Sequence, residues 1–210
     1  MPLKTTTIGA YPKPACTPVG DWFMANKSEA DRKESRGLLT NWRPGEYESE
    51  ISRVGHQAET LFLEAIEQVI NDQVSAGIDV PTDGEVRREN YILYQCRNLN
   101  GVNFEKITHK VVRDGAASAN LPTIDGPISL KEIRLDKDWK TAQQFTKNSV
   151  KITLPGPLTI ADSIANNFYN DPKKMGADLA EALNKEVLAL AEAGCAYIQV
   201  DDSPIKIRNK

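Results

Sequence analysis

Two stretches of this 210-residue chain repeat the same order of features, and this repetition limits the folds open to the chain. In each stretch a helical pattern ends at a glycine, a short apolar run follows, and acidic residues come where the run ends. The stretches are Ala76-Gly77 to Asp83-Gly84-Glu85 and Ala193-Gly194 to Asp201-Asp202. Glycine is a common helix C-cap, and a short apolar run is typical of a buried strand. The repetition predicts an α/β fold whose parallel sheet carries acidic groups at its carboxyl edge.

Long amphipathic helices are expected before both strands. Apolar residues recur at three- and four-residue spacing from Tyr47 to Ala76 and again from Pro172 to Ala193, as in a helix with one buried face. Asp171 before Pro172 favours a helix start, because aspartate caps and proline suits the first helical position. Parallel strands are expected near Thr6, Ile78, Ile152 and Ile198, the last two spanning Val150 to Leu154 and Tyr197 to Val200.

Four such strands predict a member of the TIM (β/α)8-barrel class with only about the first four βα units, since a complete barrel usually takes about 250 residues. Residues 91–145 break the pattern. Their centre, Phe104 to Leu135, is rich in Thr, Val and Ile, with turn signals at Asp114-Gly115 and Asp125-Gly126-Pro127, and predicts an inserted antiparallel excursion. We therefore expect residues 1–202 to form the amino-terminal half of a barrel, and 203–210 to be a divergent basic tail on a truncated chain.

Composition excludes several classes of function. The net charge is −3 and the basic residues are dispersed, so no basic surface for nucleic acid is expected. No apolar run is long enough to span a bilayer. The three cysteines, Cys16, Cys96 and Cys195, are far apart and form no CxxC pair, so a disulfide framework is not expected and a reducing cytoplasm is the predicted location.

Candidate functional groups are expected where the parallel strands end. Four clusters occur there: Ile8-Gly9-Ala10, Asp83-Gly84-Glu85, Gly156 to Thr159, and Asp201-Asp202. Carboxylates can hold an ammonium group and exposed backbone N–H groups a carboxylate, so these clusters predict a site for a zwitterion. The alternative is that Asp83 and Asp201 cap following helices. We favour the functional interpretation for Glu85 and Asp201, and leave both open for Asp83 and Asp202.

Other reactive residues are weaker candidates. Cys195 begins its strand, far from the predicted site, and is expected to be an inert core thiol. His56 falls on the polar side of the first helix and His109 within the excursion, so both are expected at the surface. Two separated histidines and no paired cysteines give no convincing zinc site.

Four motifs, in order along nearly the whole chain, resemble the catalytic carboxyl-terminal barrel of cobalamin-independent methionine synthases. The resemblance is to the short branch of this family, which lacks the duplicated amino-terminal barrel. The motifs are Thr5-Thr6-Thr7-Ile8-Gly9-Ala10-Tyr11-Pro12, Gly77-Ile78-Asp79 through Gly84-Glu85-Val86-Arg87-Arg88-Glu89-Asn90, Leu154-Pro155-Gly156-Pro157-Leu158-Thr159-Ile160, and Ile198-Gln199-Val200-Asp201-Asp202.

The resemblance implies methyl transfer from a methyltetrahydrofolate to the thiolate of homocysteine, activated on zinc and without cobalamin. It implies that Ile8, Gly9 and Ala10 line the amino acid's carboxylate, and that Glu85 and Asp201 hold its ammonium group. The family's zinc ligands and catalytic histidine belong to later strands, so this chain is expected to lack them and to be inactive alone.

The chain departs from the family pattern at three places. Ala10 stands where serine is frequent, Asp201-Asp202-Ser203-Pro204 replaces Asp-Glu-Pro, and Ala161 to Ser163 offer no aromatic platform for folate. Two alternatives stay open: another thiol or corrinoid methyltransferase or uroporphyrinogen decarboxylase-like barrel, or a non-catalytic remnant. The open edges of half a barrel also predict a homo-oligomer.

Overall fold

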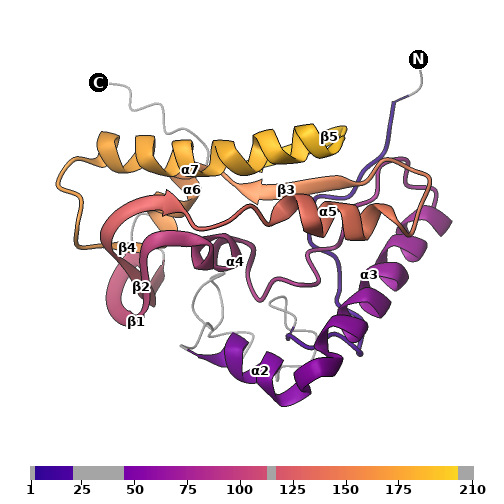
Figure 1. The fold of residues 1–210 in the computed structure, drawn as a ribbon, viewed down its shortest axis with the longest axis horizontal. Coiled ribbons are helices and arrows are strands. Elements are labelled where there is room, and N and C mark those ends of the chain that lie inside the picture. The colour runs from indigo at the N-terminus through magenta and orange to yellow at the C-terminus, as the bar shows by residue number, and fades with distance from the viewer. Residues whose placement is uncertain (1–2, 21–44, 113–116, 203–210) are drawn as a thin grey trace.

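The computed structural model describes residues 3–20, 45–112 and 117–202 (Figure 1). The expected tail 203–210 and the turn signal at Asp114-Gly115 lie outside these residues. The helices are α2 (Glu46–Val54), the 3-10 helix η1 (Gly55–Gln57), α3 (Ala58–Ser75), α4 (Tyr91–Arg97), α5 (Leu135–Gln143), α6 (Pro157–Ser163) and α7 (Pro172–Ala193). The strands are β1 (Leu99–Val112), β2 (Ala117–Leu130), β3 (Lys151–Pro155), β4 (Ala165–Asn166) and β5 (Tyr197–Asp201).

Four parallel segments lie side by side in chain order and form part of a barrel. Single parallel bridges join Thr6 to Val80 and Thr82 to Lys151, and β3 pairs with β5 from Lys151–Tyr197 to Pro155–Asp201. The strands expected near Ile152 and Ile198 are confirmed as β3 and β5.

Regular strands near Thr6 and Ile78 are a wrong prediction, because side chains replace the backbone ladder there. The backbone N–H and the hydroxyl of Thr5 both donate to Asp79 Oδ2, at 2.8 and 2.9 Å. Pro81 has no N–H to donate, and the N–H of Thr82 donates to Gln73 Oε1 at 2.9 Å. The four complete βα units expected from the sequence are therefore reduced to two regular strands and two bridged segments.

The helix expected from Tyr47 to Ala76 is two helices with an elbow between them. At Gly55 the backbone turns to φ 63° and ψ −136°, which ends α2, and η1 leads into α3. Glycine reaches this conformation without the steric penalty of a Cβ atom. The periodic apolar residues of α3 do form a buried face, which packs against Val86 and Val150.

The inserted excursion is an antiparallel hairpin, as expected, of β1 and β2, with β4 added in parallel to β2. The turn signal at Asp125-Gly126-Pro127 is wrong, because these residues lie inside β2. They face a register irregularity at Gly101, whose φ is 81° and where a Cβ atom would meet the Pro127 carbonyl oxygen at 2.5 Å. The signal therefore marks a bulge rather than a turn.

Helix α4 connects the acidic turn to this hairpin. Asn90 caps it, since its Oδ1 accepts from the N–H groups of Ile92 and Leu93 at 2.9 and 3.1 Å. Residues Tyr91 to Tyr94 are therefore helical.

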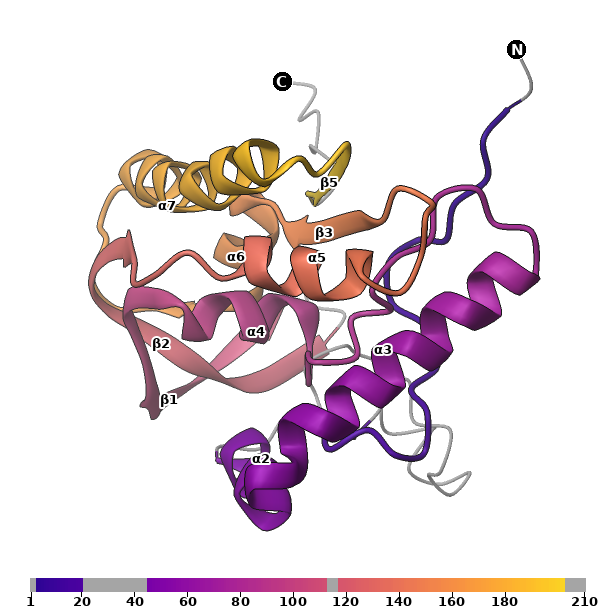
Figure 2. The same ribbon diagram turned by 45° about the vertical axis from the view of Figure 1, so that its right-hand side comes forward.

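Helix α7 runs along strands β3 and β5, and helices α5 and α6 lie near β3 on its other side (Figure 2). Leu179, Leu183 and Leu190 of α7 share a buried core with Ile152 and Leu154 of β3. Helix α7 begins as expected, with Asp171 Oδ1 accepting from the N–H of Lys173 at 2.9 Å. No helix in the described ranges is long and apolar enough to cross a membrane.

Candidate functional site

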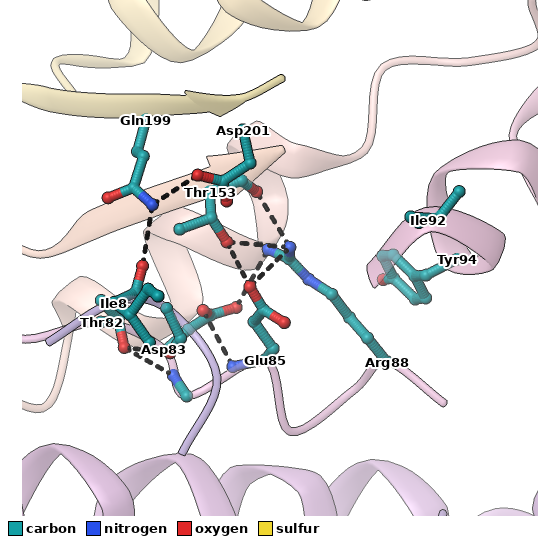
Figure 3. Close-up of polar contacts among 12 residues, drawn as sticks. Ile8, Thr82, Asp83, Glu85, Arg88, Ile92, Tyr94, Thr153, Gln199 and Asp201 are labelled. Atoms are coloured by element: carbon teal, nitrogen blue, oxygen red, sulfur yellow. Dashed lines mark hydrogen bonds and ion pairs between the residues drawn. The ribbon is translucent and has the colours of Figure 1, made fainter. Parts of the chain in front are cut away.

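The carboxyl ends of the four parallel segments meet at one rim (Figure 3). A Cβ atom added to Gly9 would lie 2.8 Å from Glu85 Oε1 and 2.9 Å from Thr153 Cγ2, so the first segment touches the second and third. Gln199 Nε2 donates to the Ile8 carbonyl oxygen at 2.9 Å and to Asp201 Oδ1 at 2.7 Å, which ties the first segment to the fourth. The structure thus places Ile8, Gly9, Glu85 and Asp201 around a single space.

Ala10 follows on the same segment and is partly exposed. The next residue, Tyr11, donates its backbone N–H to the Gly84 carbonyl oxygen at 3.1 Å. This bond holds the Ile8–Gly9–Ala10 segment against the turn that carries Glu85.

The turn around Glu85 is tight and sets the direction of its side chain. Gly84 and Glu85 both have left-handed backbones, with φ of 67° and 56°. Asp83 Oδ1 accepts from the Glu85 N–H at 3.1 Å, and the Arg88 N–H donates to the Glu85 carbonyl oxygen at 2.9 Å. A left-handed backbone costs a non-glycine residue on the order of 1 kcal/mol, so these bonds hold a conformation that the chain would not adopt alone.

The Glu85 carboxylate is only 4 % exposed and has two polar neighbours on its inner side. The Thr153 hydroxyl donates to Glu85 Oε1 at 2.6 Å, and Arg88 Nη1 lies 3.6 Å from the same oxygen. Burial raises the pKa of Glu85 above its ordinary value, whereas Arg88 and the Thr153 hydrogen bond act against that rise. Asp83 and Asp201 add to it as like charges.

Arg88 is itself buried, with 2 % exposure, among several acidic groups. Its Nη2 lies 3.6 Å from Asp83 Oδ2, and its Nη1 donates to the carbonyl oxygen and the hydroxyl of Thr153 at 2.9 and 3.1 Å. Asp138 of α5 also acts on Arg88 electrostatically. Buried charges are tolerated only when paired in this way.

Asp138 links this cluster to the surrounding helices. It accepts from the Tyr94 hydroxyl at 2.9 Å and lies 3.8 Å from Arg87 Nε. Burial raises the pKa of Asp138 to about 6, although both Arg88 and Arg87 lower it.

Asp201 is held by Gln199 of its own strand, and Lys151 of the neighbouring strand holds Gln199 in turn. Lys151 Nζ donates to the Thr7 carbonyl oxygen at 2.6 Å and to Gln199 Oε1 at 2.7 Å, while Gln199 donates to Asp201. Burial lowers the pKa of Lys151, and Asp201 acts against that change. The arrangement leaves the Glu85 carboxylate of the turn beside Gly9 and the Asp201 carboxylate of β5 near Ile8, where they could receive one ammonium group.

The remaining candidates lie as follows. Asp202 Oδ1 accepts from the Thr159 N–H at 2.8 Å in the first turn of α6, so the capping interpretation fits this residue. Asp83 both closes the Glu85 turn and pairs with Arg88. Cys195 is buried, as expected, and His56 and His109 are exposed. Within the three described ranges, no group of three or more His, Cys, Asp or Glu side chains could hold a metal ion.

Sequence reasoning missed Arg88, Thr153 and Gln199. One signal could have found the last two: along both strands polar residues alternate with apolar ones, as Lys151 and Thr153 do in β3 and Gln199 and Asp201 in β5. This period of two places them on the face opposite the apolar core.

Comparisons with known proteins agree with the geometry. The model of the cobalamin-independent synthase catalytic domain matches residues 3–208. The methionine synthase of Saccharolobus solfataricus is 31% identical over 99% of this chain and 55% of its own length, and that of Sulfolobus acidocaldarius is 30% identical over 99% and 54%. The chain thus spans about half the length of these relatives.

Solved structures give the same result. A B12-independent methionine synthase from Shewanella sp. W3-18-1, in complex with selenomethionine, superimposes with a TM-score of 0.73 and is 30% identical, over 94% of this chain and 51% of that one. A protein from Listeria monocytogenes, described as a putative vitamin-B12-independent methionine synthase, is 21% identical over 78% of this chain and 49% of its own and shares the fold with a TM-score of 0.58. Because the family model covers almost the whole chain, the chain belongs to the cobalamin-independent methionine synthase family and corresponds to part of its catalytic domain.

Proposed function

We propose that the rim is the seat of the amino-acid substrate in methyl transfer from a methyltetrahydrofolate to homocysteine. The observation that carries the proposal is that the Glu85 carboxylate lies against Gly9, while Gln199 ties Asp201 to the neighbouring Ile8 carbonyl oxygen. In this arrangement the two carboxylates hold the ammonium group of homocysteine, and backbone N–H groups of the Ile8–Gly9–Ala10 segment hold its carboxylate. The Shewanella relative, whose structure contains selenomethionine, supports an amino acid of this shape.

The site is preorganised for a zwitterion by its own bonds. Gln199 fixes Asp201, and Thr153 with the left-handed turn fixes Glu85, so neither carboxylate has to be ordered when the ligand binds. Loss of side-chain freedom is a main cost of binding, and preorganisation reduces it.

Zinc, which the family uses to activate the thiolate, has no fitting set of ligands within the described part of the chain. We therefore assign no step of the reaction to a metal on these residues. We propose that the chain provides the first four βα units of the barrel, and that the metal site belongs to the length of the relatives that this chain does not match. The 210 residues alone are then expected to bind the amino acid and not to turn it over.

Isothermal titration calorimetry with L-homocysteine and L-methionine tests the proposal. Glu85→Gln and Asp201→Asn should each weaken binding by about ten- to a hundredfold, because each removes a charged hydrogen bond worth roughly 1.5–3 kcal/mol. Glu67→Gln, which removes one exposed charge on α3, is the matched control and should bind normally. If the unaltered chain does not bind either amino acid, a non-catalytic remnant is favoured. If the unaltered chain catalyses methyl transfer, the proposal that the metal site lies outside these residues is overturned.

A further inference from the structure

The guanidinium group of Arg88 lies beside the proposed ammonium-binding carboxylate, next to both Glu85 and Thr153 (Figure 3). A buried arginine could simply connect packed elements. Its contacts are more specific than that, because both of its donor bonds from Nη1 go to Thr153, and the Thr153 hydroxyl in turn donates to Glu85. Arg88, Thr153 and Glu85 therefore form one closed set of polar contacts.

We propose that Arg88 is a positioning residue of this site: with the Thr153 hydroxyl, its guanidinium keeps the Glu85 carboxylate ionised and turned toward the rim, ready for an ammonium group. The inference rests on the proposed function for the identity of the ligand. Its first step, the control of Glu85 by Arg88, concerns this chain alone.

The charges around Glu85 explain why the cation is needed. Asp83, in the same turn, and Asp201, on β5, both face Glu85 as like charges, and Asp138 on α5 faces Arg88. The first segment faces Glu85 with Gly9, which carries no charge, and its Lys13 Nζ donates to the Arg88 carbonyl oxygen at 2.7 Å. Without Arg88, burial and two carboxylates would all favour the protonated form of Glu85. A neutral carboxyl group attracts an ammonium group far less than a carboxylate does.

The backbone makes the contact specific to Arg88. The Arg88 N–H donates to the Glu85 carbonyl oxygen at 2.9 Å and closes a turn. This turn brings the Arg88 guanidinium next to the Glu85 carboxylate. Arg87, the next residue back, points elsewhere: its guanidinium donates two bonds to Glu59, at 2.8 and 2.6 Å. The two arginines therefore form a natural pair of test and control.

The test measures the titration of Glu85 directly, by NMR of the chain carrying isotope-labelled glutamate side chains, with Glu85→Gln used to assign the signal. The variants are Arg88→Met, Arg88→Lys, Thr153→Val and, as the control of equal charge, Arg87→Met. Arg88→Met and Thr153→Val should move the Glu85 midpoint to higher pH. Arg88→Lys keeps a positive charge beside Glu85, so its Glu85 midpoint should lie closer to that of the unaltered chain than the midpoint of Arg88→Met does. Arg87→Met should leave the Glu85 midpoint near that of the unaltered chain.

A second measurement follows the affinity for L-methionine against pH by calorimetry. In Arg88→Met, affinity should fall by about tenfold for each pH unit that the midpoint lies above the assay pH, and should recover as the pH is raised. A merely structural arginine would lower affinity equally at every pH. If Arg88→Met does not fold, as judged by circular dichroism, Thr153→Val carries the same comparison, because it also removes a hydrogen bond to Glu85.

The two proposals fail in different ways. If the unaltered chain does not bind methionine while the Glu85 midpoint still responds to Arg88→Met, the proposed function fails and the control of Glu85 stands. If the Glu85 midpoint is unchanged in Arg88→Met, or in Thr153→Val where Arg88→Met does not fold, or if it moves equally in Arg87→Met, the positioning role is overturned.

Discussion

Gly9 is a residue where the site leaves little room, because the first segment approaches Glu85 and Thr153 at this point. Gly9→Ala would place a Cβ atom under 3 Å from both side chains. Overpacking of this kind typically costs about 1–3 kcal/mol, and here the displaced atoms include the carboxylate proposed to bind the ligand. We expect chemical denaturation to show this decrease in the free energy of unfolding. We also expect methionine to bind more weakly than the lower stability alone would explain.

Gly176→Ala is the matched control for that substitution. Gly176 lies inside α7, and a Cβ atom there would meet nothing within 4 Å. Alanine favours a helix over glycine by about 1 kcal/mol, so this variant should be slightly more stable and should bind normally. Equal effects of the two substitutions would show that the contact at Gly9 has no special role.

Asp138 predicts a pH dependence of stability. Its pKa is about 6 in the fold against 3.8 as the ordinary value, so between these values the folded chain keeps a proton that the unfolded chain has released. The contribution of Asp138 to stability is therefore highest below pH 3.8 and is lost as the pH rises through about 6. The shift corresponds to roughly 3 kcal/mol.

Asp138→Asn isolates this contribution, since asparagine can still accept from the Tyr94 hydroxyl. The free energy of unfolding of the variant, relative to the unaltered chain, should rise by roughly 3 kcal/mol from acidic to neutral pH. Asp136→Asn, on the same helix and paired with Lys140, serves as the control of equal charge. A difference that does not change with pH would contradict the assignment.

At the residue scale, the strand-end rule found Glu85 and Asp201 because it needs only local pattern and chain order. It could not find Arg88, since Arg87 and Arg88 are equivalent in sequence and only the turn closed at Glu85 decides which of them points inward. Thr153 was hidden for a similar reason, because its partner comes from a turn 68 residues away.

Elements with strong periodicity were predictable, and those whose backbone bonds go to side chains were not. Helix α7 and strands β3 and β5 follow from apolar spacing and a clear cap. The bridged segments near Thr6 and Val80 fail as strands because Thr5, Asp79 and Gln73 take up their backbone groups. The break at Gly55 could not be predicted, because it depends on the backbone angle ψ of that residue, which the spacing of apolar residues does not reveal.

Glu186 connects two of these elements. It is a buried residue of α7 and accepts from the N–H groups of Arg134 and Leu135, at the start of α5, and from Asn98 Nδ2 at 2.9 Å. A carboxylate at a helix amino terminus is stabilised by the helix dipole. Glu186→Ala leaves these donors without their acceptor, and we expect a loss of roughly 2–4 kcal/mol in chemical denaturation.

Glu181→Ala provides the comparison on the same helix. Glu181 is exposed and its partner Lys185 lies 3.6 Å away, so its removal should change stability by less than about 0.5 kcal/mol. Similar losses from both substitutions would mean that Glu186 does not hold α5 in place.

At the scale of the whole molecule, helix α7 packs against β3, and β5 lies at the edge of the described parallel sheet. In the described part of the chain, β5 pairs only with β3, and Val200 on it is 51% exposed. Open strand edges associate readily. We expect sedimentation velocity of the purified 210-residue chain to show association that increases with concentration. A single monomeric species across the micromolar range would contradict this.

The central claim, that Glu85 receives the ammonium group of an amino acid, is tested most directly by a double-mutant cycle on binding. The affinities of the unaltered chain and of Glu85→Gln are measured by calorimetry for L-methionine and for 4-(methylthio)butanoate, which lacks only the amino group. A direct contact predicts a coupling energy of roughly 1.5–3 kcal/mol, because removing either partner loses the same charged hydrogen bond. Changes that simply add, with no coupling energy, would contradict the account.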